Sequence, residues 1–170
     1  LPIISSNMDT VTNSVMANAM REHGAAACLH RFQSIEDNVK EFKASHNGTM
    51  VSVGIGDKEL DRAKALYDAG ATTFIVDVAH GANIAVVEQY NKLKELAKYA
   101  DVIVGNFANR ESIEEFKQLC NGLPYAYKVG IGGGSACTTR VKTGAGMPQL
   151  SSIIDCYNKG KNMVISDGGH

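Results

Sequence analysis

Short apolar runs rich in β-branched residues alternate with longer amphipathic stretches along the whole chain. The runs predict strands, and the stretches between them have the spacing of apolar positions typical of helices. Residues 73–79 (TFIVDVA) and 102–106 (VIVGN) are almost continuously apolar, which indicates strands buried on both faces of a parallel sheet. The pattern therefore predicts a parallel α/β protein. Seven strands are expected, beginning near Ile3, Ala25, Met50, Thr73, Val102, Tyr127 and Met163.

Capping residues mark the expected helices. Thr10 or Thr12 is predicted to cap the first helix, and Ser34 opens the second with a capping-box pattern. A third helix begins at Asp57 and ends at Gly70, where glycine is a common terminator. Residues 84–99 carry apolar side chains at three-residue spacing, which predicts a helical stripe facing the core. The stripe consists of Ile84, Val87, Tyr90, Leu93 and Leu96.

Polar residues and glycines gather at the carboxyl ends of the expected strands, the edge at which parallel α/β folds bind ligands. A barrel and an open doubly wound sheet both fit this pattern. A complete barrel of eight units needs about 250 residues, so the chain is expected to be part of one. The strand ends are Asn7-Met8-Asp9, His30-Arg31, Gly54-Ile55-Gly56, Asp77, His80-Gly81, Gly105-Asn106, the loop after Tyr127, and Ser166-Asp167-Gly168-Gly169.

Composition narrows the class of protein. The chain has 170 residues, 44% of them hydrophobic, and a net charge of −1, which fits one domain spanning residues 1–170. The balanced charge predicts no binding to nucleic acid or to a membrane surface. No apolar run reaches the ~20 residues of a membrane span, and the first residues do not resemble a signal peptide, so a cytoplasmic protein is expected. Cys28, Cys120 and Cys156 are expected to be inert thiols.

Residues 128–146 (KVGIGGGSACTTRVKTGAG) form the segment whose residues most clearly suggest a binding or catalytic role. Its glycines can bend the backbone sharply and expose N–H groups to a phosphate, or turn carbonyls toward a monovalent cation. Cys137 becomes a nucleophile if its surroundings stabilise the thiolate. A plain turn is the alternative. The glycine spacing matches neither the dinucleotide fingerprint nor a Walker loop.

Polar groups at three further strand ends suit a nucleotide. Asp167, followed by Gly168 and Gly169, can accept hydrogen bonds from ribose hydroxyls while the glycines let a phosphate approach the backbone. Asp77 and Asn106 end neighbouring strands and can hold the ribose and carboxamide of a second nucleotide. Each is also an ordinary turn residue, and only their convergence on one edge favours a site.

The segment KVGIGGGSACTTRVKTGAGMPQLS resembles the catalytic loop of the GMP reductases, in the family that also contains the IMP dehydrogenases. PIISSNMDTV, IVDVAHG, VGNFAN and VISDGGH resemble further strands of that family in the right order, so the resemblance covers essentially the whole chain. Asn7, the CTTRVKTG continuation and the short link between HRF and MVSVG favour the reductase branch, because that link leaves no room for an inserted regulatory domain.

The resemblance implies a (β/α)8 TIM barrel, an α/β fold that is incomplete here with about seven strands. It also implies that an NADPH-dependent enzyme converts GMP to IMP and ammonia through a covalent bond between Cys137 and the purine. Thr139 would then protonate the departing ammonia. By the same resemblance, Ser6, Met8, Ser135, Asp167, Gly168 and Gly169 bind the substrate, Asp77 and Asn106 bind the cofactor, and carbonyls of Gly132, Gly134 and Cys137 bind potassium.

The resemblance further implies a homotetramer, and the chain departs from the family pattern in places. Gly133 stands where the pattern has proline, Met147 replaces a tyrosine, and His170 follows DGG where cysteine or isoleucine is usual. By the resemblance, the eighth strand and the flap with a catalytic glutamate are expected to lie beyond His170, so the chain alone is expected to be inactive. The alternatives are an NAD-dependent oxidation of IMP to XMP, a purine-nucleotide-binding protein without catalysis, and a flavin-dependent barrel, which leaves Cys137 unexplained.

Overall fold

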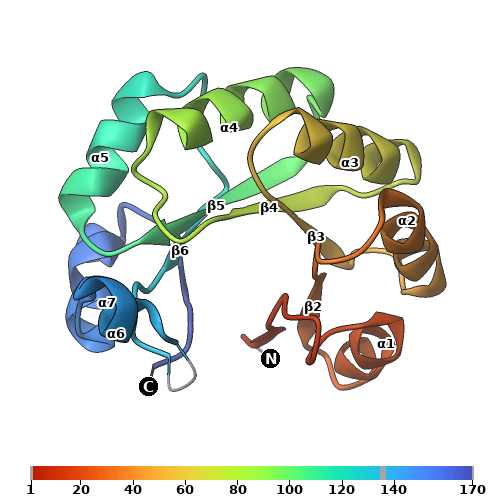
Figure 1. Ribbon diagram of the computed structural model, residues 1–170, viewed down its shortest axis with the longest axis horizontal. Coiled ribbons are helices and arrows are strands. Elements are labelled where there is room, and N and C mark those ends of the chain that lie inside the picture. Colours follow the sequence, from red (N-terminus) through yellow and green to blue (C-terminus); the bar gives the residue numbers. More distant parts are fainter. Residues whose placement is uncertain (1, 135–136, 170) are drawn as a thin grey trace. The chain divides into compact units, whose positions relative to one another are not determined.

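A computed structural model describes residues 2–134 and 137–169, and within these ranges strands and helices alternate as predicted (Figure 1). All seven expected strands are present, and a helix follows each of the first six. The elements are β1 (Ile4–Ser5), α1 (Ser14–Glu22), β2 (Ala26–Leu29), α2 (Ile35–Ala44), β3 (Met50–Val53), α3 (Asp57–Asp68), β4 (Thr73–Asp77), α4 (Ile84–Leu96), β5 (Asp101–Phe107), α5 (Arg110–Leu119), β6 (Ala126–Val129), α6 (Thr139–Thr143), α7 (Gln149–Tyr157), the 3-10 turn η1 (Asn158–Gly160) and β7 (Val164–Ser166).

The chain divides into two compact units. Unit 1 comprises residues 1–76 and 92–102, and unit 2 comprises residues 77–91 and 103–170. In unit 1, β1 to β4 pair in chain order, and in unit 2, β5, β6 and β7 do the same. Every one of these pairings is parallel. Parallel neighbours in chain order require a crossover after each strand, and the intervening helices supply it.

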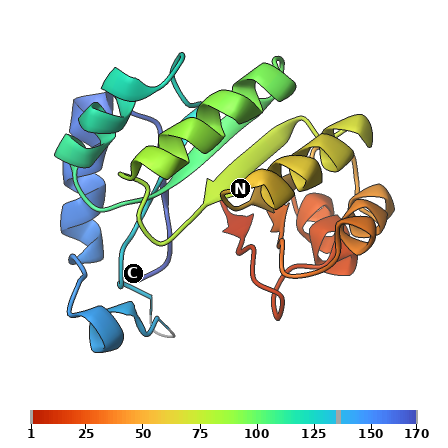
Figure 2. The ribbon, with the colours of Figure 1, turned by 45° about the horizontal axis from the view of Figure 1, so that its top comes forward.

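In unit 1, apolar strand residues such as Ala27, Val51 and Phe74 are fully buried, and α1, α2 and α3 each follow one of the first three strands (Figures 1 and 2). The Ser34 hydroxyl accepts from Asp37 N at 3.0 Å, which confirms the predicted cap of α2. Gly70 adopts a φ of 105° just after α3 and confirms the predicted glycine terminator.

The predicted cap of the first helix was wrong. The side chain of Asn13 caps α1 by accepting from Met16 N at 3.0 Å. Thr12 instead turns inward, where its hydroxyl contacts Ser5 Oγ at 3.0 Å and donates to Ser6 O at 2.5 Å. Thr12 is fully buried, so its hydroxyl satisfies polar groups at the end of β1 rather than the helix terminus.

Aromatic rings form the core of unit 2. Phe107 on β5 packs edge-to-face against Phe116 on α5 and Tyr127 on β6, with ring centroids 5.7 Å apart in both pairs. Tyr90 on α4 meets Phe116 in the same manner, and its hydroxyl donates to Gly122 O at 3.2 Å. These contacts join α4, α5, β5 and β6, and α5 and α7 lie side by side in Figures 1 and 2.

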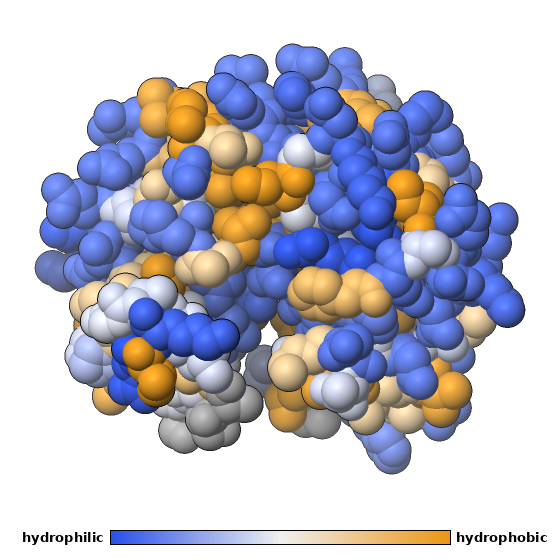
Figure 3. Space-filling model, viewed as in Figure 1, coloured by the Kyte–Doolittle hydropathy of each residue, from blue (hydrophilic) through white to orange (hydrophobic). Residues whose placement is uncertain are grey.

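The helical stripe predicted for residues 84–99 is only partly a core face. Val87, Tyr90 and Leu93 are buried, but Ile84 is 60% exposed and α4 ends at Leu96. On the face shown in Figure 3, hydrophilic residues predominate and hydrophobic ones form separate patches. Among the described residues, no helix combines the length and apolar character needed to cross a membrane.

Candidate functional site

The glycine-rich loop leaves β6 through backbone conformations that side chains would disturb. Gly130 has a φ of 145° and Gly132 a φ of 73°. A Cβ at Gly130 would lie 2.8 Å from Gln149 Oε1, and one at Gly132 would lie 2.6 Å from Arg140 Cγ. Both glycines therefore serve close packing as well as the turn. Met147 N donates to Ile131 O at 3.2 Å and returns the chain to the start of the loop.

Cys137 stands exposed immediately before α6, and its sulfur has a hydroxyl partner. Cys137 Sγ lies 3.2 Å from Thr139 Oγ1. Hydrogen bonds from the Thr139 hydroxyl and the Thr139 backbone lower the pKa of the Cys137 thiol, with smaller contributions from Gly132 N–H and the charge of Arg140. Burial raises the pKa of Cys120, and raises that of Cys156 to about 12. Cys137 is thus the thiol best suited to act as a nucleophile.

Alkylation rates should identify Cys137 as the most reactive thiol of the folded chain. The iodoacetamide rate at Cys137, followed by peptide mass spectrometry, should rise with pH with a midpoint below the pKa of about 8.5 of an ordinary thiol. Thr139→Val removes the hydroxyl donor, so the midpoint should move to higher pH, whereas Thr139→Ser should keep it. An unchanged midpoint in Thr139→Val would show that the hydroxyl does not stabilise the thiolate.

The turn after β7 lies against the glycine-rich loop. Asp167 N donates to Val129 O at 2.9 Å, which continues the β6–β7 pairing by one residue. Gly168 and Gly169 have φ values of 62° and 76°. A Cβ at Gly169 would lie 2.7 Å from Gly133 O, so the two backbones touch. The predicted DGG and cysteine-loop residues are therefore neighbours, except that Ser135 lies outside the described residues.

A cluster of polar side chains occupies unit 2 at the carboxyl ends of β4, β6 and β7. Lys128 Nζ lies 3.0 Å from Asp77 Oδ1 and 3.3 Å from Asp167 Oδ2. Asn106 Nδ2 donates to the same Asp167 oxygen at 2.5 Å and to Gly130 O at 2.7 Å. The prediction that Asp77, Asn106 and Asp167 converge is thus supported by direct contacts.

Asn106 lies within a strand, whereas the sequence predicted it at the end of one. The strand β5 continues through it to Phe107, with a register shift against β6 between Gly105 and Phe107. Such an irregularity redirects a side chain within a strand. Asn106 is buried, and its Oδ1 has no hydrogen-bond partner among the described residues.

Two residues of this cluster were not predicted from the sequence. Lys128 is buried within β6, and although burial favours its neutral form, the carboxylates of Asp77 and Asp167 raise its pKa overall. Gln149 opens α7, where its Nε2 donates to Val129 O at 2.8 Å and to Ser166 Oγ at 3.0 Å. The available signals in the sequence were a lysine within an expected strand and a glutamine shortly after the glycine-rich loop.

Ser6 and Met8 belong to unit 1, where they follow β1 and are exposed. Met8 O accepts from the backbone N–H groups of Val11 and Thr12, both at 3.0 Å, and so shapes the turn before α1. For the predicted potassium ligands, the structure shows that Gly134 O accepts from Cys137 N at 3.0 Å. Within residues 2–134 and 137–169, no three His, Cys, Asp or Glu side chains gather to hold a metal ion.

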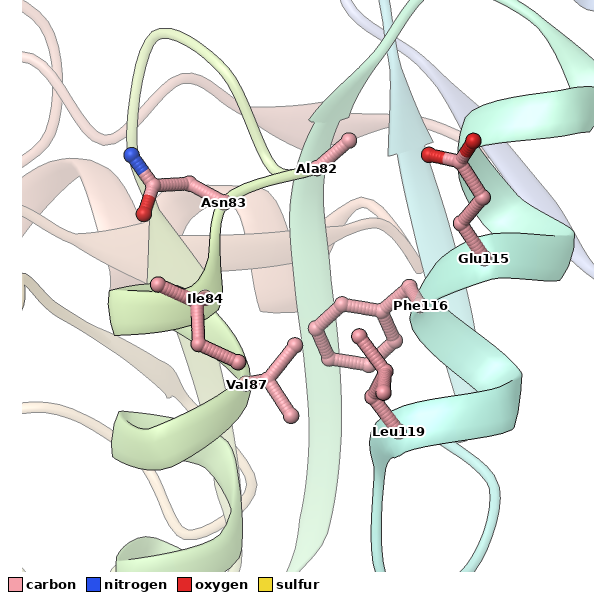
Figure 4. Close-up of a pocket in the computed structure, with 7 residues that line it drawn as sticks. All are labelled: Ala82, Asn83, Ile84, Val87, Glu115, Phe116 and Leu119. Atoms are coloured by element: carbon pink, nitrogen blue, oxygen red, sulfur yellow. The ribbon is translucent and has the colours of Figure 1, made fainter.

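A small hollow between α4 and α5 contains none of the predicted site residues. Its volume is about 70 Å³, and Ile84 and Val87 face Phe116 and Leu119 across it (Figure 4). The remaining lining residues are Ala82, Asn83 and Glu115. None of the residues that line this hollow belongs to the cysteine loop or to the polar cluster.

Parallel strands in chain order, each linked to the next by a helix, together with polar groups at their carboxyl ends, place this chain in the (β/α)8-barrel class. The structure of an IMP dehydrogenase from Legionella pneumophila matches it with a TM-score of 0.93 and 44% identity, covering 100% of this chain and 51% of that one. This similarity confirms the predicted fold class, an incomplete barrel of seven strands.

Sequence comparison gives the family. The model described as "IMP dehydrogenase / GMP reductase domain" matches residues 1–170, so the chain belongs to this family. A GMP reductase from Aliivibrio salmonicida is 39% identical and one from Vibrio campbellii 37% identical, each over 99% of this chain. The chain spans about half the length of these relatives, since the alignments cover 50% of each.

Proposed function

We propose that this chain supplies the catalytic cysteine loop of a GMP reductase, which converts GMP to IMP and ammonia. The observation that carries the proposal is the exposed Cys137 thiol with its partner Thr139 at 3.2 Å. The relatives named GMP reductase support the reductase branch of the family over the dehydrogenase branch. A protein that only binds nucleotides needs neither an activated thiol nor the adjacent hydroxyl.

The reaction is proposed to proceed in two stages at carbon 2 of the purine. The Cys137 thiolate attacks this carbon, a carbon–sulfur bond forms, and the bond to the amino nitrogen breaks to release ammonia. The Thr139 hydroxyl, 3.2 Å from the sulfur, would pass a proton to the departing nitrogen and take one back from water, so that it ends neutral. A bound nicotinamide cofactor would supply a hydride to the same carbon, and Cys137 would then leave as the thiolate. Covalent catalysis of this kind divides one difficult displacement into two easier steps.

The substrate nucleotide is proposed to bind where the DGG turn meets the cysteine loop. Asp167 would accept hydrogen bonds from the ribose hydroxyls, and Gly168 and Gly169 would admit the phosphate to the backbone, together with Ser135. The positive φ values of the two glycines support this assignment, and at Gly169 a side chain would also strike Gly133 O. Ser6 and Met8 remain predicted substrate-binding residues.

NADPH is proposed as the cofactor and would supply the hydride when bound. The residues fit its carboxamide, because Asn106 Oδ1 is a buried acceptor that has no partner among the described residues. Asp77 would accept from a ribose hydroxyl. A potassium ion on the carbonyls of Gly132, Gly134 and Cys137 remains a prediction, and neutral backbone oxygens suit a weakly hydrated cation. A homotetramer and an NADPH-specific rather than NAD-specific site also remain predictions.

Two substrate pairs test the proposal in the complete natural protein. NADPH consumption with GMP, and release of ammonia in equal amount, are expected. Rapid acid quenching followed by mass spectrometry should show a purine attached to Cys137. Turnover of IMP with NAD and no turnover of GMP with NADPH would favour the dehydrogenase, a second candidate supported by the 44% identity to the Legionella pneumophila enzyme. Nucleotide binding without turnover or adduct would favour the non-catalytic alternative.

A further inference from the structure

The carboxylates assigned above to two different ligands share one ammonium group. Asp77 is proposed to bind the cofactor and Asp167 the substrate ribose, yet Lys128 Nζ lies 3.0 Å from the first and 3.3 Å from the second. The side chain of Lys128 is 11% exposed, against 22% for Asp77 and 34% for Asp167. Lys128 is thus the most buried of the three side chains, and both carboxylates are more accessible to solvent.

The pairing of β5 with β6 determines the path of the Lys128 side chain. Lys128 lies opposite Gly105 in the parallel register of β5 and β6. A Cβ at Gly105 would lie 2.5 Å from Lys128 Cβ and 2.8 Å from Lys128 O, so only glycine leaves room for the lysine there. Val78 N donates to Gly105 O at 3.0 Å, which brings the end of β4 beside β5. The lysine stem therefore passes Gly105 and reaches Asp77.

A backbone hydrogen bond also places the second carboxylate, that of Asp167, close to Lys128 Nζ. Asp167 N donates to Val129 O, the residue after Lys128, at 2.9 Å. Asn106 Nδ2 donates to Asp167 Oδ2, which leaves that carboxylate between a neutral donor and a cation. Two carboxylates this close repel each other unless a positive charge lies between them. Without Lys128, they would move apart or one would take up a proton.

We propose that Lys128 is a positioning residue that orients Asp77 and Asp167 together, so that the substrate site and the cofactor site depend on one shared counterion. This inference rests on the proposed function for the identity of the two ligands. Lys128 acts through the carboxylates, and its own contact with either ligand is not required. Its replacement should weaken the binding of both ligands at once.

Binding measurements on the complete natural protein test this without relying on turnover. Titration calorimetry with IMP and fluorescence titration with NADPH are expected to show both dissociation constants raised roughly tenfold or more in Lys128→Met. Lys128→Arg keeps the charge and should recover most of both losses. Lys117→Met is the matched control, because Lys117 on α5 pairs with Glu114 at 3.0 Å and with Asn162 at 2.6 Å, and among the described residues it pairs with no proposed ligand residue.

A charge-balance variant separates positioning from a purely structural role. Asp77→Asn in the Lys128→Met background removes the like-charge repulsion on Asp167, so IMP affinity should return toward the natural value although the structure has lost two charges. Thermal unfolding is recorded for each variant. Unchanged affinities in folded Lys128→Met, or loss in only one titration, would overturn the inference. Failure of the natural protein to bind IMP and NADPH would instead overturn the proposed function.

Discussion

Replacing Cys137 by alanine is expected to reduce GMP reduction by at least about a thousandfold, because the proposed reaction begins with the attack of this thiolate. The residue is exposed, and its main-chain N–H donates to Gly134 O, a bond that alanine retains. The dissociation constant for IMP should therefore change by no more than about threefold, since the ribose and phosphate ligands are elsewhere. Steady-state assays and calorimetry measure the two quantities.

Cys120→Ala is the appropriate control for the loss of a thiol. Cys120 is partly exposed in unit 2, and its Sγ lies 3.0 Å from Gly122 O, where burial raises its pKa. Activity should remain within about twofold, because an inert thiol contributes only packing. If Cys137→Ala kept full activity, the covalent route would be wrong. If it lost IMP binding as well, the cysteine would serve the pocket rather than the chemistry.

The strands could be predicted because apolar runs report burial directly. β5 is buried at every residue but its first, and β4 is buried at its three central residues, Phe74, Ile75 and Val76, all of them apolar. Helix termini were predicted less well. Thr12 has the chemistry of a cap, but a polar group at the end of β1 competes for its hydroxyl, and Asn13 takes the capping position. The sequence around Thr12 does not show that the competing acceptor is Ser6 O, which follows β1.

Asp77, Asn106 and Asp167 of the polar cluster were predicted from the sequence, whereas Lys128 was missed. Asp77 and Asp167 follow apolar runs, so their position at the ligand-binding edge was readable from the sequence. Lys128 lies within a strand, and a single sequence does not show which distant carboxylates neutralise it. Its burial depends on pairing with both of them. The exposed end of the α4 stripe at Ile84 was missed for a similar reason, since periodicity does not say how far the covering element extends.

Replacing Arg62 by methionine is expected to lower the free energy of unfolding by about 3–5 kcal/mol, the largest stability change predicted for unit 1. Arg62 on α3 is only 2% exposed. Its guanidinium donates to Glu59 Oε1 at 3.2 Å and to Asn38 Oδ1 at 2.9 Å, and it also donates to the carbonyls of Gln33 and Ser34. Methionine fills similar space but leaves these acceptors unpaired.

Glu59 makes the loss severe, because its charge is also buried. Its Oε2 accepts from Gly54 N at 2.7 Å at the end of β3, while Oε1 depends on Arg62. Removing one partner of such a pair leaves an uncompensated charge away from water, which costs more than the pair contributes. Glu59→Gln combined with Arg62→Met should therefore lose less than Arg62→Met alone. That ordering would identify the stranded carboxylate as the main cause.

Urea denaturation at neutral pH, followed by far-ultraviolet circular dichroism, measures these differences. Lys64→Met is the matched control on the same helix, since Lys64 pairs with Asp68 at 2.7 Å but both side chains are more than 60% exposed. An exposed pair contributes at most about 1 kcal/mol, so this variant should remain close to the natural chain. Equal effects of Arg62→Met and Lys64→Met would contradict the assignment of a buried network, because then solvent would reach the Arg62 guanidinium and its partners.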